Sequence, residues 1–163
     1  MELQSSRLIF SKFAKQDLPD YLSLVTDVEL MKFIHNGAMS ELDAKARFEV
    51  VVANNQDSPL LGFWAARSKE SNVLIGFVKI AEVEGDKVEV GYAVIPAFWG
   101  NGYASEMLQA MIDFCSHHFS EVPLYGLVQS ENLVSIKLLE KFQFHQYKAE
   151  TQERYTLLYF VRD

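Results

Sequence analysis

Cysteine is nearly absent from the sequence, which contains a single one, Cys115, in 163 residues. One thiol cannot form a disulfide within the chain, and it cannot build the thiolate cluster of a zinc site. We therefore expect neither a disulfide framework nor a metal centre.

Long apolar runs are missing too, because no stretch approaches the ~20 residues that a membrane-spanning helix needs. The opening segment, MELQSSRLIF, has no basic region followed by an apolar run, so it does not resemble a secretory signal. Internal repeats, low-complexity tracts and linkers rich in Pro, Gly and Ser are absent as well. These absences predict a cytoplasmic protein without membrane association, in which residues 1–163 form a single domain.

Basic side chains are in the minority, with 15 Lys and Arg against 22 Asp and Glu, which gives a net charge of −7. Binding to nucleic acid requires clustered Lys and Arg to neutralise phosphates, so the balance argues against a general nucleic-acid binder. An acidic surface instead suits cationic amines and basic polypeptides.

Hydrophobic spacing along the chain predicts strands and helices in the order of an α/β protein. Alternating apolar residues indicate strands, three of which follow one another through short turns as an antiparallel meander. Helical spacing and capping residues indicate helices between the other strands. The predicted strands are 7–13, 60–67, 73–83, 87–95, 122–129 and 154–162, and the predicted helices are 18–26, 28–34, 41–54, 104–119 and 132–142. We expect a mixed, mainly antiparallel central sheet flanked by helices.

The stretch PAFWGNGYASEML, residues 96–108, places two glycines immediately before a predicted helix. Glycines without side chains at a helix N-terminus allow an anion to approach the first backbone N–H groups of the helix, which are unpaired donors. The alternative interpretation is a tight turn that binds no ligand. The stretch is not a P-loop, since Tyr103 and Ala104 follow Gly102 where Lys and Ser or Thr are needed. It is not a dinucleotide fingerprint either, because Ser105 stands in place of the third glycine.

Residues 88–108, VEVGYAVIPAFWGNGYASEML, resemble the coenzyme-A-binding core of the GNAT superfamily of N-acetyltransferases. The nearest likeness is the branch of ribosomal-protein N-terminal acetyltransferases. Residues 5–34 resemble that branch's opening strand and paired helices, and residues 129–144, QSENLVSIKLLEKFQF, are similar to its second coenzyme-A element. Two positions depart from the family pattern: Trp99 replaces a Gln or Arg, and Leu139 replaces the tyrosine that many members use as general acid.

The resemblance implies a GNAT-like fold and acetyl-CoA as cosubstrate. Backbone amides around the two glycines would bind its diphosphate, and the edge of the preceding strand would pair with pantetheine. The Asn132 side chain can donate to a pantetheine carbonyl, or it can cap the helix that follows. The residues implied in cosubstrate binding are Ala93, Val94, Ile95, Trp99, Gly100, Asn101, Gly102, Tyr103, Ala104, Ser105, Asn132 and Ser135.

Acetyl transfer to an amine requires a base for the amine and an acid for the leaving thiolate. The resemblance assigns the base to Glu89, with Glu82 as the alternative; a solvent-facing strand residue is the simpler interpretation of Glu89. Ser135 is the candidate acid, followed by Tyr103, although Ser135 can also be an ordinary helix residue near the thiol.

The branch resemblance favours a protein or peptide N-terminal amine as acceptor, bound by either a monomer or a homodimer. Residues 18–34 and 41–54 would form one wall of the acceptor groove, and residues 146–154 the other. Two alternatives stay open: acetylation of a small amine such as a polyamine, amino sugar or amino-acid analogue, and a non-catalytic sensor of acyl-CoA.

Overall fold

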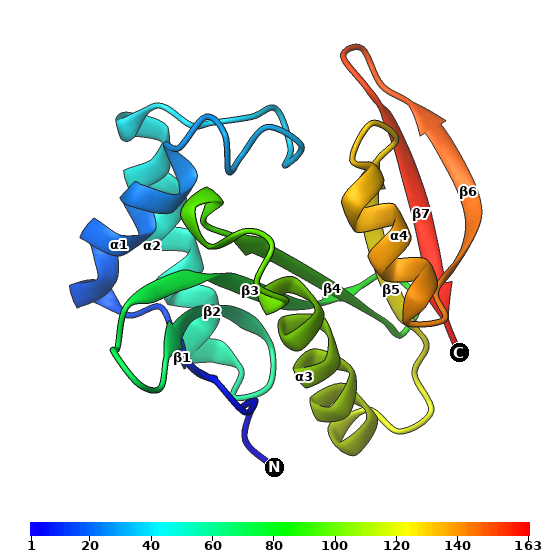
Figure 1. Ribbon diagram of the computed structural model, residues 1–163, viewed down its shortest axis with the longest axis horizontal. Coiled ribbons are helices and arrows are strands. Elements are labelled where there is room, and N and C mark those ends of the chain that lie inside the picture. The colour runs from blue at the N-terminus through cyan, green and yellow to red at the C-terminus, as the bar shows by residue number, and fades with distance from the viewer.

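Seven strands form one sheet in the computed structural model, which describes residues 1–163 (Figure 1). The strands are Leu8–Lys12 (β1), Gly62–Ser68 (β2), Leu74–Val83 (β3), Lys87–Val94 (β4), Leu124–Gln129 (β5), His145–Thr151 (β6) and Thr156–Arg162 (β7). Their order across the sheet is β1-β2-β3-β4-β5-β7-β6, and every neighbouring pair is antiparallel except β4 and β5. The predicted mixed, mainly antiparallel sheet of an α/β protein is therefore confirmed.

Four α-helices and two short 3-10 helices connect these strands. They are Lys15–Asp17 (η1), Leu18–Val25 (α1), Glu41–Asp57 (α2), Pro96–Phe98 (η2), Tyr103–His118 (α3) and Leu133–Lys141 (α4). Ser40 caps the start of α2, because its hydroxyl accepts a hydrogen bond from the amide of Asp43 at 3.1 Å. None of the helices has the length and apolar composition that crossing a membrane requires.

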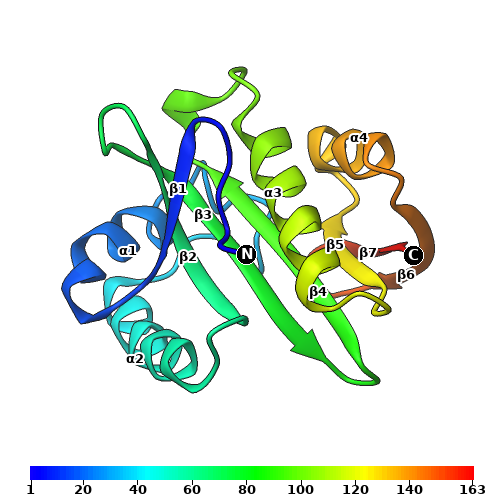
Figure 2. The ribbon, with the colours of Figure 1, turned by 90° about the horizontal axis from the view of Figure 1, so that it is seen from below.

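Two hydrophobic clusters, one on each face of the sheet, hold the helices in place. Side chains of α1 and α2, such as Tyr21, Leu24 and Phe48, pack with Ala93 of β4 on one face. Side chains of α3 and α4 pack with the alternate residues of β4, among them Val90, on the other face. Figure 2 shows the two helix pairs on opposite sides of the sheet. Successive residues of β4 therefore point alternately to the α1/α2 face and to the α3/α4 face.

The prediction of a short helix at residues 28–34 is wrong, because the segment from 26 to 38 consists of turns and bends. The Asp27 side chain does accept a bond of the kind that caps a helix, from the amide of Leu30 at 2.8 Å. The Met31 amide makes a single helix-like bond, to the carbonyl of Asp27 four residues back, but the later amides bond three residues back, including Ile34 to Met31 at 3.0 Å. So short a segment gains few hydrogen bonds for the cost of helix nucleation, and turns bury Leu30 and Met31 without one.

Strand β6 was not predicted, because residues 146–154 were expected to form a connection between two other strands. Six of the seven residues of β6 are exposed, so the strand carries no apolar alternation that would reveal it. It lies at the edge of the sheet, where polar and charged side chains are the rule. The remainder of the segment forms the turn between β6 and β7.

Candidate active site

A gap opens in the sheet where β4 separates from β5. The two strands pair only at Val88 with Leu124 and at Glu89 with Tyr125, and they diverge beyond that point (Figure 1). The Ile95 amide still donates to β3, to the carbonyl of Ile75 at 2.8 Å. Because main-chain groups alternate in direction along an antiparallel ladder, those of Tyr92 and Val94 face the gap instead. The predicted strand edge therefore exists, but Ala93 and Ile95 direct their main chains to β3.

The glycine loop, residues 99–102, lies between η2 and the first turn of α3. Gly100 and Gly102 have φ angles of 77° and 78°, the left-handed region that glycine adopts without steric cost. None of the six backbone N–H groups from Gly100 to Ser105 donates a hydrogen bond within the chain, and no side chain caps α3. A β-carbon on Gly100 would meet no atom within 4 Å, so the loop surface is open. This arrangement fits a diphosphate better than an ordinary turn.

The side chains of Trp99 and Asn101 stabilise the glycine loop through hydrogen bonds to nearby main-chain carbonyls. The Asn101 amide nitrogen donates to the carbonyls of Phe98 and Trp99, at 3.0 and 3.1 Å. The indole Nε1 of Trp99 donates to the carbonyl of Val94 at 2.7 Å and so ties the loop to β4. Two residues that were predicted to bind the cosubstrate therefore use their side chains internally, and the backbone amides of the loop remain for an anion.

Ser5 and Arg7 of the N-terminal segment bind Glu106 in the first turn of α3, and we call this set of contacts the clamp. No local pattern in the sequence indicates it. The Glu106 carboxylate accepts hydrogen bonds from the Ser5 hydroxyl at 2.6 Å and from the Arg7 amide and Nε at 2.7 Å each. Nη2 of Arg7 donates to the carbonyl of Asn101 at 3.0 Å, which fixes the orientation of the loop. Burial alone would raise the pKa of Glu106, but the bonds from Ser5 and Arg7 and the charge of Arg7 together lower it.

The predicted base, Glu89, is the last residue of β4 that pairs with β5, and its side chain is 16% exposed. It lies on the α1/α2 face and forms an ion pair with Lys79 of β3. Sequence reasoning missed Lys79, although the short turn between β3 and β4 sets a register that places the two side chains diagonally. The alternative base, Glu82, is exposed near that turn and lies on the opposite face.

The start of α4 borders the gap on the α3/α4 face. The Asn132 Oδ1 accepts the amide of Ser135 at 3.3 Å, so this side chain caps the helix, while its NH₂ group remains able to donate. Ser135 is half-buried. Leu139 packs against Gly126 of β5, where a β-carbon would lie only 3.2 Å from its Cδ2, so position 139 is filled by the core.

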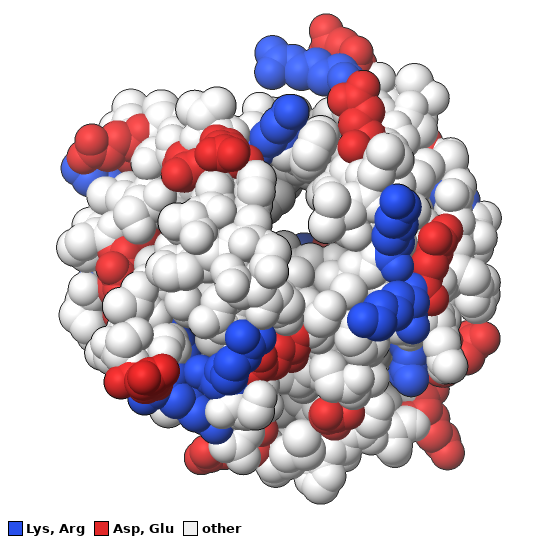
Figure 3. All heavy atoms as spheres, in the orientation of Figure 1, with Lys and Arg blue, Asp and Glu red and all other residues white.

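The turn segment before α2 bridges to β5 and limits the gap at its far end. Nε2 of Gln129 donates to the carbonyl of His35 at 2.8 Å, and His35 has a φ of 52°. Figure 3 shows the resulting opening between the two halves of the molecule. A hollow of about 330 Å³ adjoins it, lined by Asn36 and residues 152–155 of the β6–β7 turn. Gln129 was not foreseen, because no local pattern connects it with residue 35.

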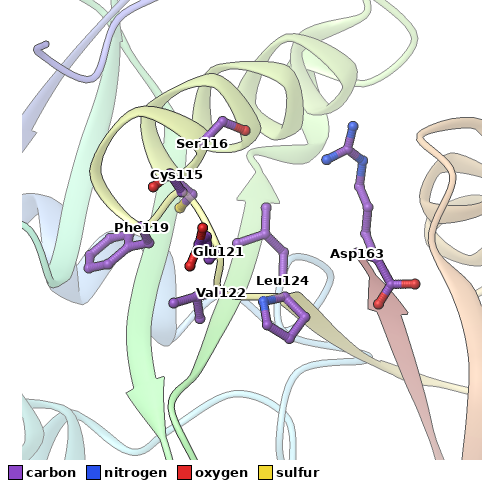
Figure 4. A pocket seen from close by; sticks show the side chains of 10 residues that line it. Cys115, Ser116, Phe119, Glu121, Val122, Leu124 and Asp163 are labelled. Carbon is purple, nitrogen blue, oxygen red and sulfur yellow. The ribbon is translucent and has the colours of Figure 1, made fainter.

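A second hollow, of about 450 Å³, lies at the C-terminal end of α3, opposite to the glycine loop (Figure 4). Cys115 and Phe119 line it together with Leu124 and the C-terminal Asp163. Burial raises the pKa of Cys115 to about 12, so the thiol does not ionise near neutral pH. This hollow therefore offers no thiolate nucleophile.

The clamp generates a prediction about stability and pH. Glu106→Gln should lower the free energy of unfolding at pH 7 by about 1–2 kcal/mol, since it weakens hydrogen bonds to a charged group. Because the folded-state pKa of Glu106 is lowered, its contribution is complete above the unfolded value near 4.3 and is lost as the pH falls through the folded value. Urea unfolding from pH 3 to 8 should show the two proteins converging below about pH 4. Glu41→Gln, at an exposed pair with Lys45, is the control; a pH-independent difference for Glu106→Gln would contradict the prediction.

Comparisons with known proteins agree with this geometry. A family model described as an acetyltransferase (GNAT) domain matches residues 7–145. Among curated proteins, the uncharacterised N-acetyltransferase YnaD of Bacillus subtilis strain 168 is 27% identical over 146 residues, which cover 86% of this chain and 81% of that protein.

Solved structures share the fold over nearly the whole chain. An acetyltransferase of the GNAT family from Bacillus anthracis has a TM-score of 0.84 at 20% identity, covering 99% of this chain and 98% of that one. RimL, a ribosomal L7/L12 α-N-protein acetyltransferase in complex with coenzyme A, has a TM-score of 0.82 at 14% identity, covering 98% and 96%. Spermidine N-acetyltransferase from Vibrio cholerae, in complex with CoA and spermine, has a TM-score of 0.80 at 16% identity, covering 96% and 95%.

At such identities the solved structures establish the fold alone, and the family model establishes membership because it spans most of the sequence. The resemblance found in residues 88–108 and 129–144 is confirmed at the level of the family. The chain belongs to the GNAT family and is an acetyltransferase.

Proposed function

We propose that residues 1–163 form a single N-acetyltransferase domain that transfers the acetyl group of acetyl-CoA to the N-terminal amine of a polypeptide. The observation that carries the cosubstrate assignment is the run of six free backbone amides, Gly100 to Ser105, at the N-terminus of α3 beside the gap. A diphosphate accepts hydrogen bonds from such amides, and the helix dipole favours its charge. Two structural neighbours, RimL and the spermidine acetyltransferase, are described in complexes with coenzyme A.

From the loop, the acyl arm would follow the free edge of β4. The main-chain groups of Tyr92 face the gap and can pair with the amides of pantetheine, as in strand addition. The carbonyl of Val94 is already bonded to Trp99, which leaves its N–H for this role. Asn132 and Ser135 lie on the far side of the gap, and the NH₂ group of Asn132 can donate to a pantetheine carbonyl. The thioester would then lie at the opening between β4 and β5.

The acceptor amine would approach the thioester from the α1/α2 face, where Glu89 lies. Holding the amine and the thioester in line supplies much of the rate, and Glu89 accepts the amine proton directly or through water. The ion pair with Lys79 fixes the Glu89 carboxylate in place. The opening between the two halves, rather than an enclosed pocket, supports an acceptor whose chain extends away from the site (Figure 3).

A small cationic amine is the second candidate acceptor. The net charge of −7 and a carboxylate at the opening favour a cation of either kind. A peptide α-amine has a reference pKa near 8, against about 10.4 for a lysine-like amine, so a single carboxylate frees the peptide amine more readily at neutral pH. If the acceptor is instead a small amine, polyamines and amino sugars should be the better substrates.

The acceptor class is tested by comparing kcat/KM at pH 7.5, from thiol release, for short peptides with free N-termini, for polyamines and for amino sugars. We expect the best peptide to exceed every small amine. A small amine that exceeds the best peptide more than tenfold, about 1.4 kcal/mol in transition-state binding, would overturn the polypeptide assignment. If none of these amines gives thiol release, the result would favour a non-catalytic acyl-CoA sensor over both acceptor classes.

Removal of the base is the second test of the proposed function. Glu89→Gln should lower kcat at neutral pH by roughly 10²-fold, the usual scale for a positioned base. The loss should shrink as the pH rises toward 9, because free amine then becomes abundant without assistance. Glu82→Gln, on the opposite face, is the matched control and should retain wild-type rates. Equal rates for Glu89→Gln and the wild type from pH 6 to 9 would exclude Glu89 as the base.

A further inference from the structure

Tyr92 carries a buried hydroxyl without a hydrogen-bond partner. It is the only buried side-chain nitrogen or oxygen in the structure that lacks one. Buried polar groups are almost always paired, and each exception in a folded protein requires an explanation. Since Tyr92 also directs its main chain into the gap, a ligand in the gap is the first explanation to consider.

The Tyr92 side chain lies on the α3/α4 face, where it packs against the cluster that includes Val90 and Val94. Glu89 is three residues earlier on the same strand and points to the other face. The strand therefore presents a carboxylate on one face of the sheet and a phenol on the other, both on the β4 side of the gap. Acyl transfer needs this separation, because the amine attacks on one side of the carbonyl carbon and the sulfur leaves on another.

The hydroxyl of Tyr92 lies close to Ser135 at the start of α4, although the two groups do not meet in hydrogen-bond geometry. Ser135 and Leu139 are four residues apart on α4 and so lie on one face of the helix, one turn from each other. Leu139 occupies the place where the family resemblance expects a tyrosine, and it packs against Gly126. Tyr92 thus brings a phenol to the same part of α4 from the facing strand.

We propose that Tyr92 is a catalytic residue that donates a hydrogen bond to the thioester sulfur as the acyl group leaves. This inference rests on the proposed acetyl-CoA-dependent function. In the step, the amine nitrogen forms a bond to the acyl carbon, the C–S bond breaks and its electron pair moves to sulfur. The phenol hydrogen bond stabilises the charge on sulfur, and the proton lost by the amine balances the one that completes the free thiol.

Proton affinities favour hydrogen-bond donation over complete transfer. A thiol has a reference pKa near 8.5 and tyrosine one near 10, so moving the phenol proton fully to a thiolate is uphill. Burial raises the pKa of Tyr92 further, while Ser135 acts in the opposite direction. The phenol therefore keeps its proton at neutral pH and remains a donor throughout the reaction.

The first test is Tyr92→Phe, which removes the hydroxyl alone. We expect kcat to fall roughly 10- to 100-fold, the value of one hydrogen bond to a charged atom, with the dissociation constant of acetyl-CoA within about threefold of wild type. The melting temperature without ligand should not fall, because the variant loses an unpaired buried hydroxyl. Tyr21→Phe is the matched control and should keep wild-type kcat, because the Tyr21 ring is buried in the core against Phe13 and Phe48 and does not face the acceptor groove.

A pH profile adds a readout that a packing role would not change. A fluorinated tyrosine at position 92, whose phenol ionises at a lower pH, should bring the alkaline fall in kcat to a lower pH; the same residue at position 21 should not. The inference is overturned if Tyr92→Phe keeps kcat within twofold, if the variant changes KM alone, or if the fluorinated residue leaves the profile unchanged. Absence of turnover in the wild type would instead refute the proposed function.

Discussion

The separation of β4 from β5 beyond Glu89 is the constraint on which the rest of the structure depends. A strand edge inside a folded protein exposes donors and acceptors that must find partners. Here the Trp99 indole satisfies the carbonyl of Val94, and the main chain of Tyr92 is left at the gap. Pro96 follows at once and cannot donate to a ladder, so the chain leaves the sheet through η2. As a result, the glycine loop and the N-terminus of α3 lie beside the gap.

The same separation divides the proposed chemistry between two faces of the sheet. A base on the α1/α2 face and donors on the α3/α4 face can act on opposite sides of one thioester without meeting each other. The supports are distinct as well: Lys79 holds Glu89, whereas Arg7 holds the loop through Asn101. Preorganisation of this kind reduces the reorganisation that binding and reaction would otherwise require.

The sequence predicted those features that local patterns encode. The alternation of apolar and polar residues predicted the three-stranded meander. The pair of glycines before a helix predicted the loop, and both glycines have positive φ angles in the structure. Contacts across long stretches of chain leave no local pattern, which is why the Arg7–Glu106 clamp and the Gln129–His35 bridge were missed. Strand β6 escaped detection because an exposed edge strand carries no apolar period. The roles of Glu89, Ser135 and Asn132 in the reaction remain predictions.

The central claim is that the amides of residues 100–105 bind the diphosphate of acetyl-CoA, and an amide-resolved NMR titration with coenzyme A tests it most directly. The account predicts that these six amides shift most, with one saturation curve, and that Gly102→Val abolishes the shifts because a branched residue is strained at a φ of 78°. Gly85→Val, at a φ of 81° in the β3–β4 turn, should retain them. Shifts that leave residues 100–105 unchanged and gather around Cys115 and Phe119, at the opposite end of α3, would contradict the account.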